Sequence, residues 1–411
     1  MSELKTRIYN PLDSEVQENP YPVYRHFREN YPLVNTVISE KMKLWFVFRY
    51  DDVAAILKDL RFGRSAVGKI PQEQLGKISP EFKPVVDLLM GSMLNQDPPG
   101  HTHLRKIIGK AFASFLANKK MERTIEQAAD SLIDDVLQKR EIDFISDFAA
   151  PLPLMINAAV LGVPEQDRMK LKKWANFLFH IIDLNPQKEQ VRADGILAME
   201  EMKAYFRNLI TLRKKNPEDD LITAMIHAED NREKLNEEEL IANCGLFVGA
   251  GHETTISALG NGMFALLKNP EQMEMLCKNP QLMPTAVEEM LRYDSPIQFV
   301  SRFAFEDVDM GEMKIPKGGL VAVVLGSANR DSKYFNDAEN FDIQRHPNPH
   351  LAFGFGGHLC LGQNLARTEI QLALKLFFEK IKKVEMKGNF QRKRMTAFRG
   401  LESLPLSIQP N

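Results

Sequence analysis

The feature that most constrains the fold of this chain is the stretch from residue 100 to residue 295, which has the pattern of successive amphipathic helices. A chain dominated by such segments builds its core mainly by packing helix against helix. Two other segments, KLWFVFRY near the start and GGLVAVVLGSAN after residue 317, are typical of β-strands. The sequence therefore predicts a mainly α, α+β fold with a large helical part and a smaller β-sheet part.

The chain has 411 residues, which by length alone is compatible with two or three domains. It contains no internal repeat, low-complexity tract or Ser/Gly-rich linker that would divide it. We therefore expect one continuous domain over residues 1–411.

Charge and cysteine content exclude several classes of function. The 53 basic and 55 acidic residues give a formal net charge of -2, so neither nucleic acid nor an anionic membrane is expected as the main partner. The N-terminal residues lack an apolar signal region, and no run approaches the roughly 20 apolar residues of a membrane span. The three cysteines form no CxxC pair, which argues against a disulfide framework and a structural zinc site. We expect a cytoplasmic protein without a membrane anchor.

One decapeptide, FGFGGHLCLG at residues 353–362, concentrates four glycines, a histidine and a cysteine. It ends a long irregular connection that starts near Asn336, and such connections inside compact domains are usually functional. The following LGQNLARTEIQLALKLFFEKI has helical spacing, so Cys360 lies at a predicted helix N-terminus, where the thiolate form is favoured. The residues expected to line the buried face of that helix are Leu361, Leu365, Leu372, Leu376 and Phe377.

A lone cysteine is most often a small buried residue, but the residues around Cys360 favour another interpretation. The pattern F-x-x-G-x-H-x-C-x-G is met in full and resembles the haem-thiolate signature of the cytochrome P450 monooxygenases. The resemblance implies the cytochrome P450 fold, with haem b between an oxygen-cleft helix and the helix that follows the cysteine. It implies Cys360 as the axial iron ligand, with the loop residues Phe353, Gly356 and Gly362 holding the haem.

The segment GLFVGAGHETTIS places polar residues inside an otherwise apolar helix, at a cost in helix propensity. The hydroxyls of Thr254 and Thr255 could simply bond back to carbonyls one turn earlier and bend the helix. A zinc-binding H-E-x-x-H helix is excluded, because Ile256 stands where the second histidine would be. AGHETT resembles the oxygen-cleft motif of the same family, which implies room over the iron at Ala250 and Gly251 and proton relay by Glu253 and Thr254.

Two further segments agree with the resemblance. In AVEEMLRYDSP, Glu289 and Arg292 have the spacing of an ordinary exposed ion pair, worth about 0.2 to 0.5 kcal/mol. The resemblance instead implies a buried structural network of these two residues with Arg345 beneath the haem loop.

The segment DPPGHTHLRK opens a helix with His101 and Arg105 on one face. They could form an ordinary solvated basic face, but the resemblance makes them partners of the haem propionates, together with Arg302, His358 and, as a less certain candidate, His350. The later AFASF, residues 111–115, departs from many bacterial relatives, which have a proline and an arginine after the AF pair.

The resemblance is closest to soluble bacterial enzymes that hydroxylate polyketides, macrolides or fatty-acyl chains. It implies insertion of one oxygen atom of O2 into a C–H bond of a bulky, mainly apolar substrate, with terpenoids and steroids also possible. For any single residue expected around the substrate, an ordinary position in the core is about as common as a position at the substrate. These expected lining residues are Leu89, Met90, Met93 and Leu94, in an irregular segment, Phe177, Phe179, Leu246, Phe247, Ile297, Phe299 and Phe398.

The chain contains no flavin or nicotinamide fingerprint, so the resemblance implies electrons from a separate ferredoxin or flavodoxin with its reductase. Lys106 and Lys110 are candidate docking residues for such a carrier, although solvated lysines are the ordinary case. Two other functions stay open from the sequence. One is a non-catalytic haem sensor or carrier, and the other is a hydrolase with Cys360 as nucleophile and His358 or another histidine as base.

Overall fold

The structure is a computed structural model that describes residues 8–39, 42–66, 69–70, 82–117, 120–184, 189–311 and 313–411. It divides into two compact units, each assembled from three pieces of the chain. Unit 1 consists of Met1–Gly76, Lys268–Cys360 and Arg392–Gly400, and unit 2 consists of Lys77–Leu267, Leu361–Gln391 and Leu401–Asn411. Neither unit is one continuous segment, so the units are not successive domains of the sequence. The expected single domain over residues 1–411 stays a prediction.

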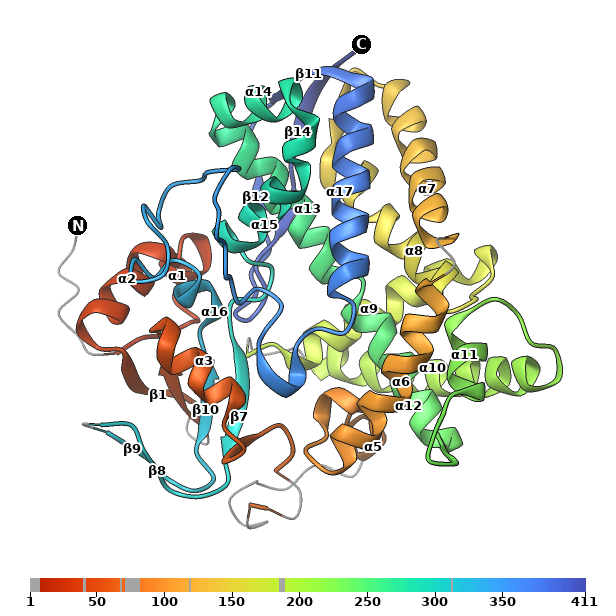
Figure 1. Cartoon of the computed structure of the whole chain (residues 1–411), viewed down its shortest axis with the longest axis vertical. Helices are drawn as coiled ribbons and strands as arrows, with labels where there is room; N and C mark the ends of the chain where they lie inside the picture. Colours follow the sequence, from red (N-terminus) through yellow and green to blue (C-terminus); the bar gives the residue numbers. More distant parts are fainter. Residues whose placement is uncertain are drawn as a thin grey trace. The chain divides into compact units, whose positions relative to one another are not determined.

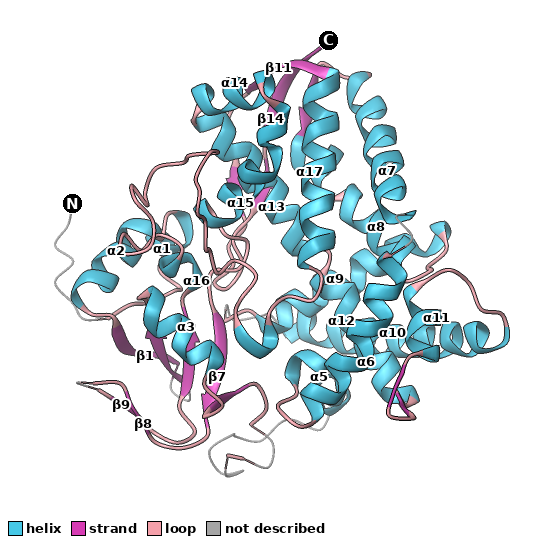
Figure 2. Ribbon diagram, viewed as in Figure 1, coloured by secondary structure: helices cyan, strands magenta, loops and turns pink. Residues whose placement is uncertain are grey.

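Unit 1 combines short helices with the larger β-sheet (Figure 2). Its described helices are α1 (Ser14–Glu18), α2 (Tyr21–Asn30), α3 (Tyr50–Lys58), α14 (Pro270–Lys278), α15 (Met283–Tyr293) and α16 (Leu325–Ala328). Its strands are β1 (Leu33–Ser39), β2 (Met42–Val47), β3 (Phe62–Gly63), β7 (Val300–Ala304), β8 (Val308–Asp309), β9 (Lys314–Ile315) and β10 (Leu320–Val323).

The main sheet of unit 1 has the strand order β1-β2-β10-β7-β3. Strands β10 and β2 are parallel, and the other neighbours are antiparallel. One side of the sheet packs on α3 through fully buried side chains such as Val53 and Ile56 of the helix and Val321 and Val323 of β10. These branched side chains suit a pleated, buried surface, so the apolar runs that predicted strands also build the core of unit 1.

Unit 2 is the helical part of the molecule. Its described helices are α5 (Lys83–Gly91), α6 (Gly100–Leu116), α7 (Lys120–Leu137), α8 (Pro151–Val160), α9 (Arg168–Ile182), α10 (Glu189–Lys215), α11 (Leu221–His227), α12 (Glu237–Ala250), α13 (Glu253–Lys268) and α17 (Gln363–Lys380). Its strands β4 (Glu141–Asp143), β11 (Ile381–Met386) and β14 (Pro405–Pro410) form a sheet in the order β11-β14-β4, and β5 (Glu229–Asp230) pairs with β6 (Glu233–Lys234). Strand β13 (Leu401–Ser403) also belongs to unit 2, and β12 (Gln391–Arg392) spans the two residues at which the chain passes from unit 2 to unit 1.

Two structural details concern helices α17 and α12 of unit 2. Helix α17 lies beside α7, as Figure 1 shows. Helix α12 begins with a reciprocal capping box, in which the Asn236 side chain accepts from the Glu239 N–H at 3.0 Å and the Glu239 carboxylate accepts from the Asn236 N–H at 2.8 Å. The capping box satisfies two helix-terminal donors and fixes where α12 starts.

The main expectations for secondary structure are confirmed. Helices fill most of residues 100–295, and β2 and β10 overlap the two predicted strand segments, although the LGSA part of the second segment forms α16. The chain between α16 and α17 has no helix or strand except a 3₁₀ turn at Gly356–His358, as expected for an irregular connection. The AFASF segment lies inside α6, which continues to Leu116.

Two local predictions are wrong. The sequence suggests an irregular segment at residues 85–95, but these residues lie in α5 and a 3₁₀ turn at Met93–Asn95. Only Phe377 of the five residues expected on the buried face of α17 is buried. The buried residues are Glu369, Ile370, Ala373, Leu374 and Phe377. Both sets fit helical spacing, and packing against α7 selects the second.

Among the described residues, no helix combines the length and the apolar character that crossing a membrane would require.

Candidate functional site

Cys360 is held by a tight glycine-rich loop at the end of the 268–360 segment of unit 1. The Cys360 N–H donates to the Phe353 carbonyl at 2.9 Å, and the Gly354 N–H donates to the Leu351 carbonyl at 2.8 Å. Gly356 has φ +72°, and a Cβ there would lie 2.6 Å from the Leu57 carbonyl oxygen of α3. Both the left-handed backbone and the close approach require glycine at position 356.

The three cysteines, all in described parts of the chain, differ in their surroundings and none forms a disulfide. Cys360 is half-buried, Cys244 is buried inside α12, and Cys277 is exposed on α14. Burial raises the pKa of Cys244 far above its ordinary value, so that thiol is unsuited to act as a thiolate. A Cβ added at Gly354 would approach only the His358 carbonyl, at 3.8 Å, so the backbone beside Cys360 is uncrowded.

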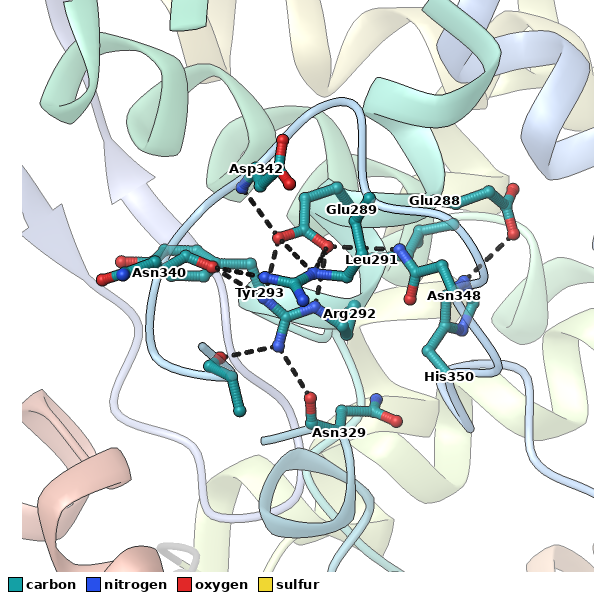
Figure 3. Close-up of polar contacts among 12 residues, drawn as sticks. Glu288, Glu289, Leu291, Arg292, Tyr293, Asn329, Asn340, Asp342, Asn348 and His350 are labelled. Atoms are coloured by element: carbon teal, nitrogen blue, oxygen red, sulfur yellow. Dashed lines mark hydrogen bonds and ion pairs between the residues drawn. The ribbon is translucent and has the colours of Figure 1, made fainter. Parts of the chain in front are cut away.

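Glu289 and Arg292 of α15 form the centre of a buried network in unit 1 (Figure 3). Arg292 Nε donates to Glu289 Oε2 and Arg292 Nη2 donates to Glu289 Oε1, both at 2.7 Å, and both side chains are 0% exposed. Arg345 Nε lies 3.1 Å from Glu289 Oε2, and Asn348 and the Asp342 N–H also donate to the Glu289 carboxylate. An ordinary exposed ion pair is therefore excluded.

The same network connects α15 to the irregular connection that leads to Cys360. Arg292 donates to the carbonyls of Asn329, Ala338 and Asn340 at 2.9, 2.7 and 3.0 Å. Burial lowers the pKa of Arg292, while the hydrogen bonds and charge of Glu289 oppose that effect. Because the guanidinium satisfies two carboxylate oxygens and three carbonyls at once, it fixes the path of the connection over residues 329–340.

The fifth candidate propionate partner, His350, makes two contacts inside unit 1. His350 Nε2 lies 3.1 Å from Glu288 Oε2 (Figure 3). His350 Nδ1 accepts from the Ala352 N–H at 3.2 Å. Its side chain is only 2% exposed. Both ring nitrogens therefore have partners within unit 1, and the expected role of His350 toward a propionate stays a prediction.

The other four candidate propionate partners lie in both units. In unit 2, His101 is buried in the first turn of α6 and Arg105 follows one turn later, half-buried. In unit 1, Arg302 is buried on β7 and His358 ends the 3₁₀ turn before Cys360. Their joint action on one ligand stays a proposal.

The two candidate docking lysines form ion pairs with an aspartate of the same chain. Lys106 Nζ lies 2.8 Å from Asp230 Oδ2 and Lys110 Nζ lies 2.7 Å from Asp230 Oδ1. Hydrogen bonds from the two ammonium groups hold the pKa of Asp230 below its ordinary value. A negatively charged partner would have to compete with Asp230 for these lysines.

The oxygen-cleft segment of unit 2 is a break between α12 and α13. Helix α12 ends at Ala250 and α13 starts at Glu253, with the residues between them in a turn. Thr254 Oγ1 donates to the Ala250 carbonyl at 2.8 Å, and Thr255 Oγ1 donates to the Gly251 carbonyl at 3.4 Å. The expected back-bonding of both threonines is thus present. Glu253 is buried and accepts from the Ser257 hydroxyl at 3.3 Å.

The apolar lining candidates are also divided between the units. In unit 2, Met93 and Phe179 are buried, Leu94 is 38% exposed, and Leu89, Met90, Phe177, Leu246 and Phe247 are intermediate. In unit 1, Ile297 is intermediate and forms an isolated bridge with the buried Phe398, while Phe299 packs edge-to-face on Phe46.

The pairing of Ile297 with Phe398 is held by a buried charge cluster in unit 1 that the sequence had not singled out. Arg399 Nε donates to Asp294 Oδ1 at 2.6 Å, and the Tyr21 hydroxyl donates to the same oxygen at 2.6 Å. Burial disfavours the charged form of Asp294, yet Arg399 and Arg392 outweigh it and hold its pKa below the ordinary range. No local motif marked Asp294 or Arg399, because their partners are more than 100 residues apart in sequence.

Comparisons with known proteins agree on one family. The family model described as Cytochrome P450 matches residues 5–398. The chain is 38% identical to the Biotin biosynthesis cytochrome P450 of Bacillus subtilis (strain 168) over 397 residues, covering 96% of this chain and 98% of that protein. It is 35% identical to the Polyketide biosynthesis cytochrome P450 PksS of the same organism over 408 residues, covering 98% of each chain. A crystal structure of P450BioI with a hexadec-9Z-enoic acid ligated acyl carrier protein matches with a TM-score of 0.88 and 36% identity, covering 96% of this chain and 100% of that one.

Proposed function

The chain belongs to the cytochrome P450 family and is a haem-thiolate monooxygenase, and from that premise we propose the residues and the substrate class through which it acts. The overall reaction converts R–H, O2, two electrons and two protons into R–OH and water. Neither the haem carrier nor the Cys/His hydrolase is favoured, because the relatives are named as biosynthetic cytochromes P450 and match this chain over 98% of their length.

Haem b is the proposed cofactor, and the donor set of the chain fits it. A half-buried thiol on a glycine-rich loop matches the thiolate ligand that haem iron takes in this family, and a buried or half-buried histidine and arginine from each unit can donate hydrogen bonds to two propionates. Cys360 would ligate the iron, while His101, Arg105, Arg302 and His358 would bind the propionates. When bound, the haem supplies the activation of O2.

The break between α12 and α13 is proposed to handle protons and leave room for oxygen. Ala250 and Gly251 present no bulky side chain. The Thr254 hydroxyl donates to the Ala250 carbonyl and keeps its oxygen lone pairs able to accept from a second donor. The buried carboxyl of Glu253 lies next to it in the chain and can resupply a proton.

The substrate is proposed to be bulky and mainly apolar. All the lining candidates are Leu, Met, Ile or Phe, which leave a small polar metabolite without hydrogen-bond partners and adapt to large irregular surfaces. One similar structure holds an acyl chain ligated to its carrier protein, and one similar protein is named for polyketide biosynthesis. We therefore favour a fatty-acyl or polyketide chain, ahead of a macrolide, terpenoid or steroid.

The proposed electron source is a ferredoxin or flavodoxin with its own reductase, and the proposed location is the cytoplasm. We keep one cytochrome P450 domain over residues 1–411 as the proposed organisation, because each unit is closed by pieces of chain from distant parts of the sequence.

The loop geometry of Cys360 carries this proposal, and the absorption spectrum tests it. The purified protein should bind haem b and, when reduced under carbon monoxide, show the red-shifted band of thiolate ligation. Cys360→Ala should abolish that band, whereas Cys244→Ala and Cys277→Ala should keep it. A Cys360→Ala protein with an unchanged band would show that the ligand has been misassigned.

A further inference from the structure

An asparagine that the sequence had not singled out lies against the helix break. Asn157 is in α8, whose sequence PLPLMINAAV is otherwise apolar, and it is 8% exposed. Its Nδ2 donates to the Phe247 carbonyl at 3.1 Å and to the Val248 carbonyl at 3.2 Å. A buried polar side chain in an apolar helix is costly unless such bonds are made, so the two contacts explain why an asparagine is tolerated there.

The helix break lengthens or removes the intrahelical hydrogen bonds of these two carbonyls. In a continuous α-helix, Phe247 and Val248 would accept from the N–H groups of Gly251 and His252. Instead the Gly251 N–H lies at a long 3.4 Å from the Phe247 carbonyl, and the His252 N–H turns to the Gly249 carbonyl at 3.2 Å. The Asn157 amide, which has two N–H donors, therefore takes the place of the helical partners.

Asn157 and Gly251 also fit each other sterically. A Cβ built at Gly251 would lie 3.0 Å from Asn157 Oδ1 and 3.3 Å from Asn157 Cγ. The amide thus occupies the space in which a side chain at residue 251 would stand. Any tightening of the turn that brings residue 251 toward α8 is blocked by the same contact.

We propose that Asn157 is a positioning residue that holds the break between α12 and α13 open and thereby sets the place of Thr254. The Thr254 hydroxyl bonds to the Ala250 carbonyl, the last residue of α12, so its direction follows the geometry of the break. Without the amide, the Val248 carbonyl would again accept a hydrogen bond from the His252 N–H. The segment between α12 and α13 would then become a continuous helix. This inference rests on the proposed function for its catalytic consequence, but the geometric step stands without it.

The experiment compares Asn157→Leu and Asn157→Asp with wild type, using Ile156→Val as a control for packing in α8. The first readout is amide hydrogen exchange of the haem-loaded protein over residues 247–256. Asn157→Leu should change protection of the His252 N–H, because its acceptor changes, whereas Ile156→Val should leave that pattern unchanged. Unaltered exchange in both Asn157 variants would overturn the proposal without reference to the reaction.

The second readout is product formed per electron consumed, measured with the carbon monoxide spectrum as a check on haem loading. Asn157→Leu should lower this ratio about three- to tenfold, the effect of one or two hydrogen bonds, with the excess electrons appearing as hydrogen peroxide. Thr254→Ala should lower it as well, and the double variant should be no worse than Thr254→Ala alone, because both changes act on one proton transfer. Additive losses would contradict a role through Thr254.

Asn157→Asp provides a test that survives if Asn157→Leu does not fold. When the introduced carboxyl is protonated, its O–H can donate one hydrogen bond to a carbonyl. When it is ionised, it has no donor for either of the two carbonyls. The product ratio of this variant should therefore rise as the pH falls, relative to wild type and to Ile156→Val. A pH profile parallel to wild type would overturn the proposal. If wild type itself consumed no reductant, the proposed function would fail while the exchange result still decided the geometric step.

Discussion

A carboxyl group without a hydrogen-bond partner on one of its oxygens lies in the middle of α17. Glu369 is 3% exposed, and its Oε1 has no partner among the described residues. Burial raises the pKa of Glu369 to about 8. Neither the sequence nor the proposed mechanism assigned this residue a role, although a carboxyl that is neutral at physiological pH is unusual.

The raised pKa makes stability depend on pH in a defined direction. Between the ordinary glutamate pKa and about 8, the folded protein keeps a proton that the unfolded chain has lost. The stabilising contribution of Glu369 is therefore complete below the ordinary pKa and is lost as the pH rises through about 8. A substitution that removes the titrating carboxyl of Glu369 should therefore remove this loss of stability at high pH.

We expect Glu369→Gln to raise the free energy of unfolding at pH 8–9 by about 2–4 kcal/mol relative to wild type, and by much less near pH 5. Urea unfolding of the haem-loaded proteins between these pH values measures the difference. Glu379→Gln, on the same helix with a side chain 49% exposed, is the matched control and should leave the pH profile unchanged. Parallel profiles for wild type and Glu369→Gln would mean that Glu369 is ionised in the folded protein.

At the scale of elements, the 0% exposed Glu289–Arg292 pair joins helix α15 to the connection that carries Cys360. The guanidinium of Arg292 makes five hydrogen bonds, three of them to carbonyls of residues 329–340. Removing one partner of a buried ion pair destabilises the folded protein strongly, because the remaining charge has no water to solvate it.

Arg292→Leu should destabilise the protein by about 3–5 kcal/mol and prevent stable haem incorporation, since it strands Glu289 and frees three buried carbonyls. Haem content per protein and the midpoint of thermal unfolding measure the effect. Arg168→Leu removes an ion pair of the same spacing, with Glu165, whose side chain is 79% exposed, and should cost less than about 1 kcal/mol. A stable, fully loaded Arg292→Leu protein would show that the network is dispensable.

Helix α17 shows why an element can be predicted while its packing is not. Its start, three residues after Cys360, follows from the glycine-rich loop and the apolar spacing of the segment. The sequence indicates the wrong residues for its buried side, because Leu372 and Ala373 both fit a helical repeat. The elements that pack on α17, α7 among them, bury the side that holds Ala373.

At the scale of the whole molecule, the apolar character of the lining candidates in both units predicts which ligands bind. Long-chain fatty acids, polyketides and macrolides titrated into the ferric protein should displace iron-bound water and shift the haem absorption, with dissociation constants near or below the micromolar range. Small charged metabolites of similar solubility serve as controls and should cause no shift. If only the small charged compounds bound, the proposed apolar lining of the substrate site would be abandoned.

The sequence by itself determined the local features of this protein. The glycines around Cys360, the prolines before α6 and the Asn236–Glu239 cap specify turns and helix starts through backbone preferences of a few neighbouring residues. The family followed from the decapeptide FGFGGHLCLG, and the comparisons confirm it.

Only the tertiary structure decided which distant residues meet. It places Arg399 on Asp294, gives both ring nitrogens of His350 a partner, and brings Asn157 to carbonyls about 90 residues away. The physical reason is that a hydrogen bond between such residues depends on the path of every intervening helix and loop, whereas the conformational preference of each residue extends only to its sequence neighbours. The turns and helix starts could therefore be derived from the sequence, whereas these hydrogen bonds between distant residues could not.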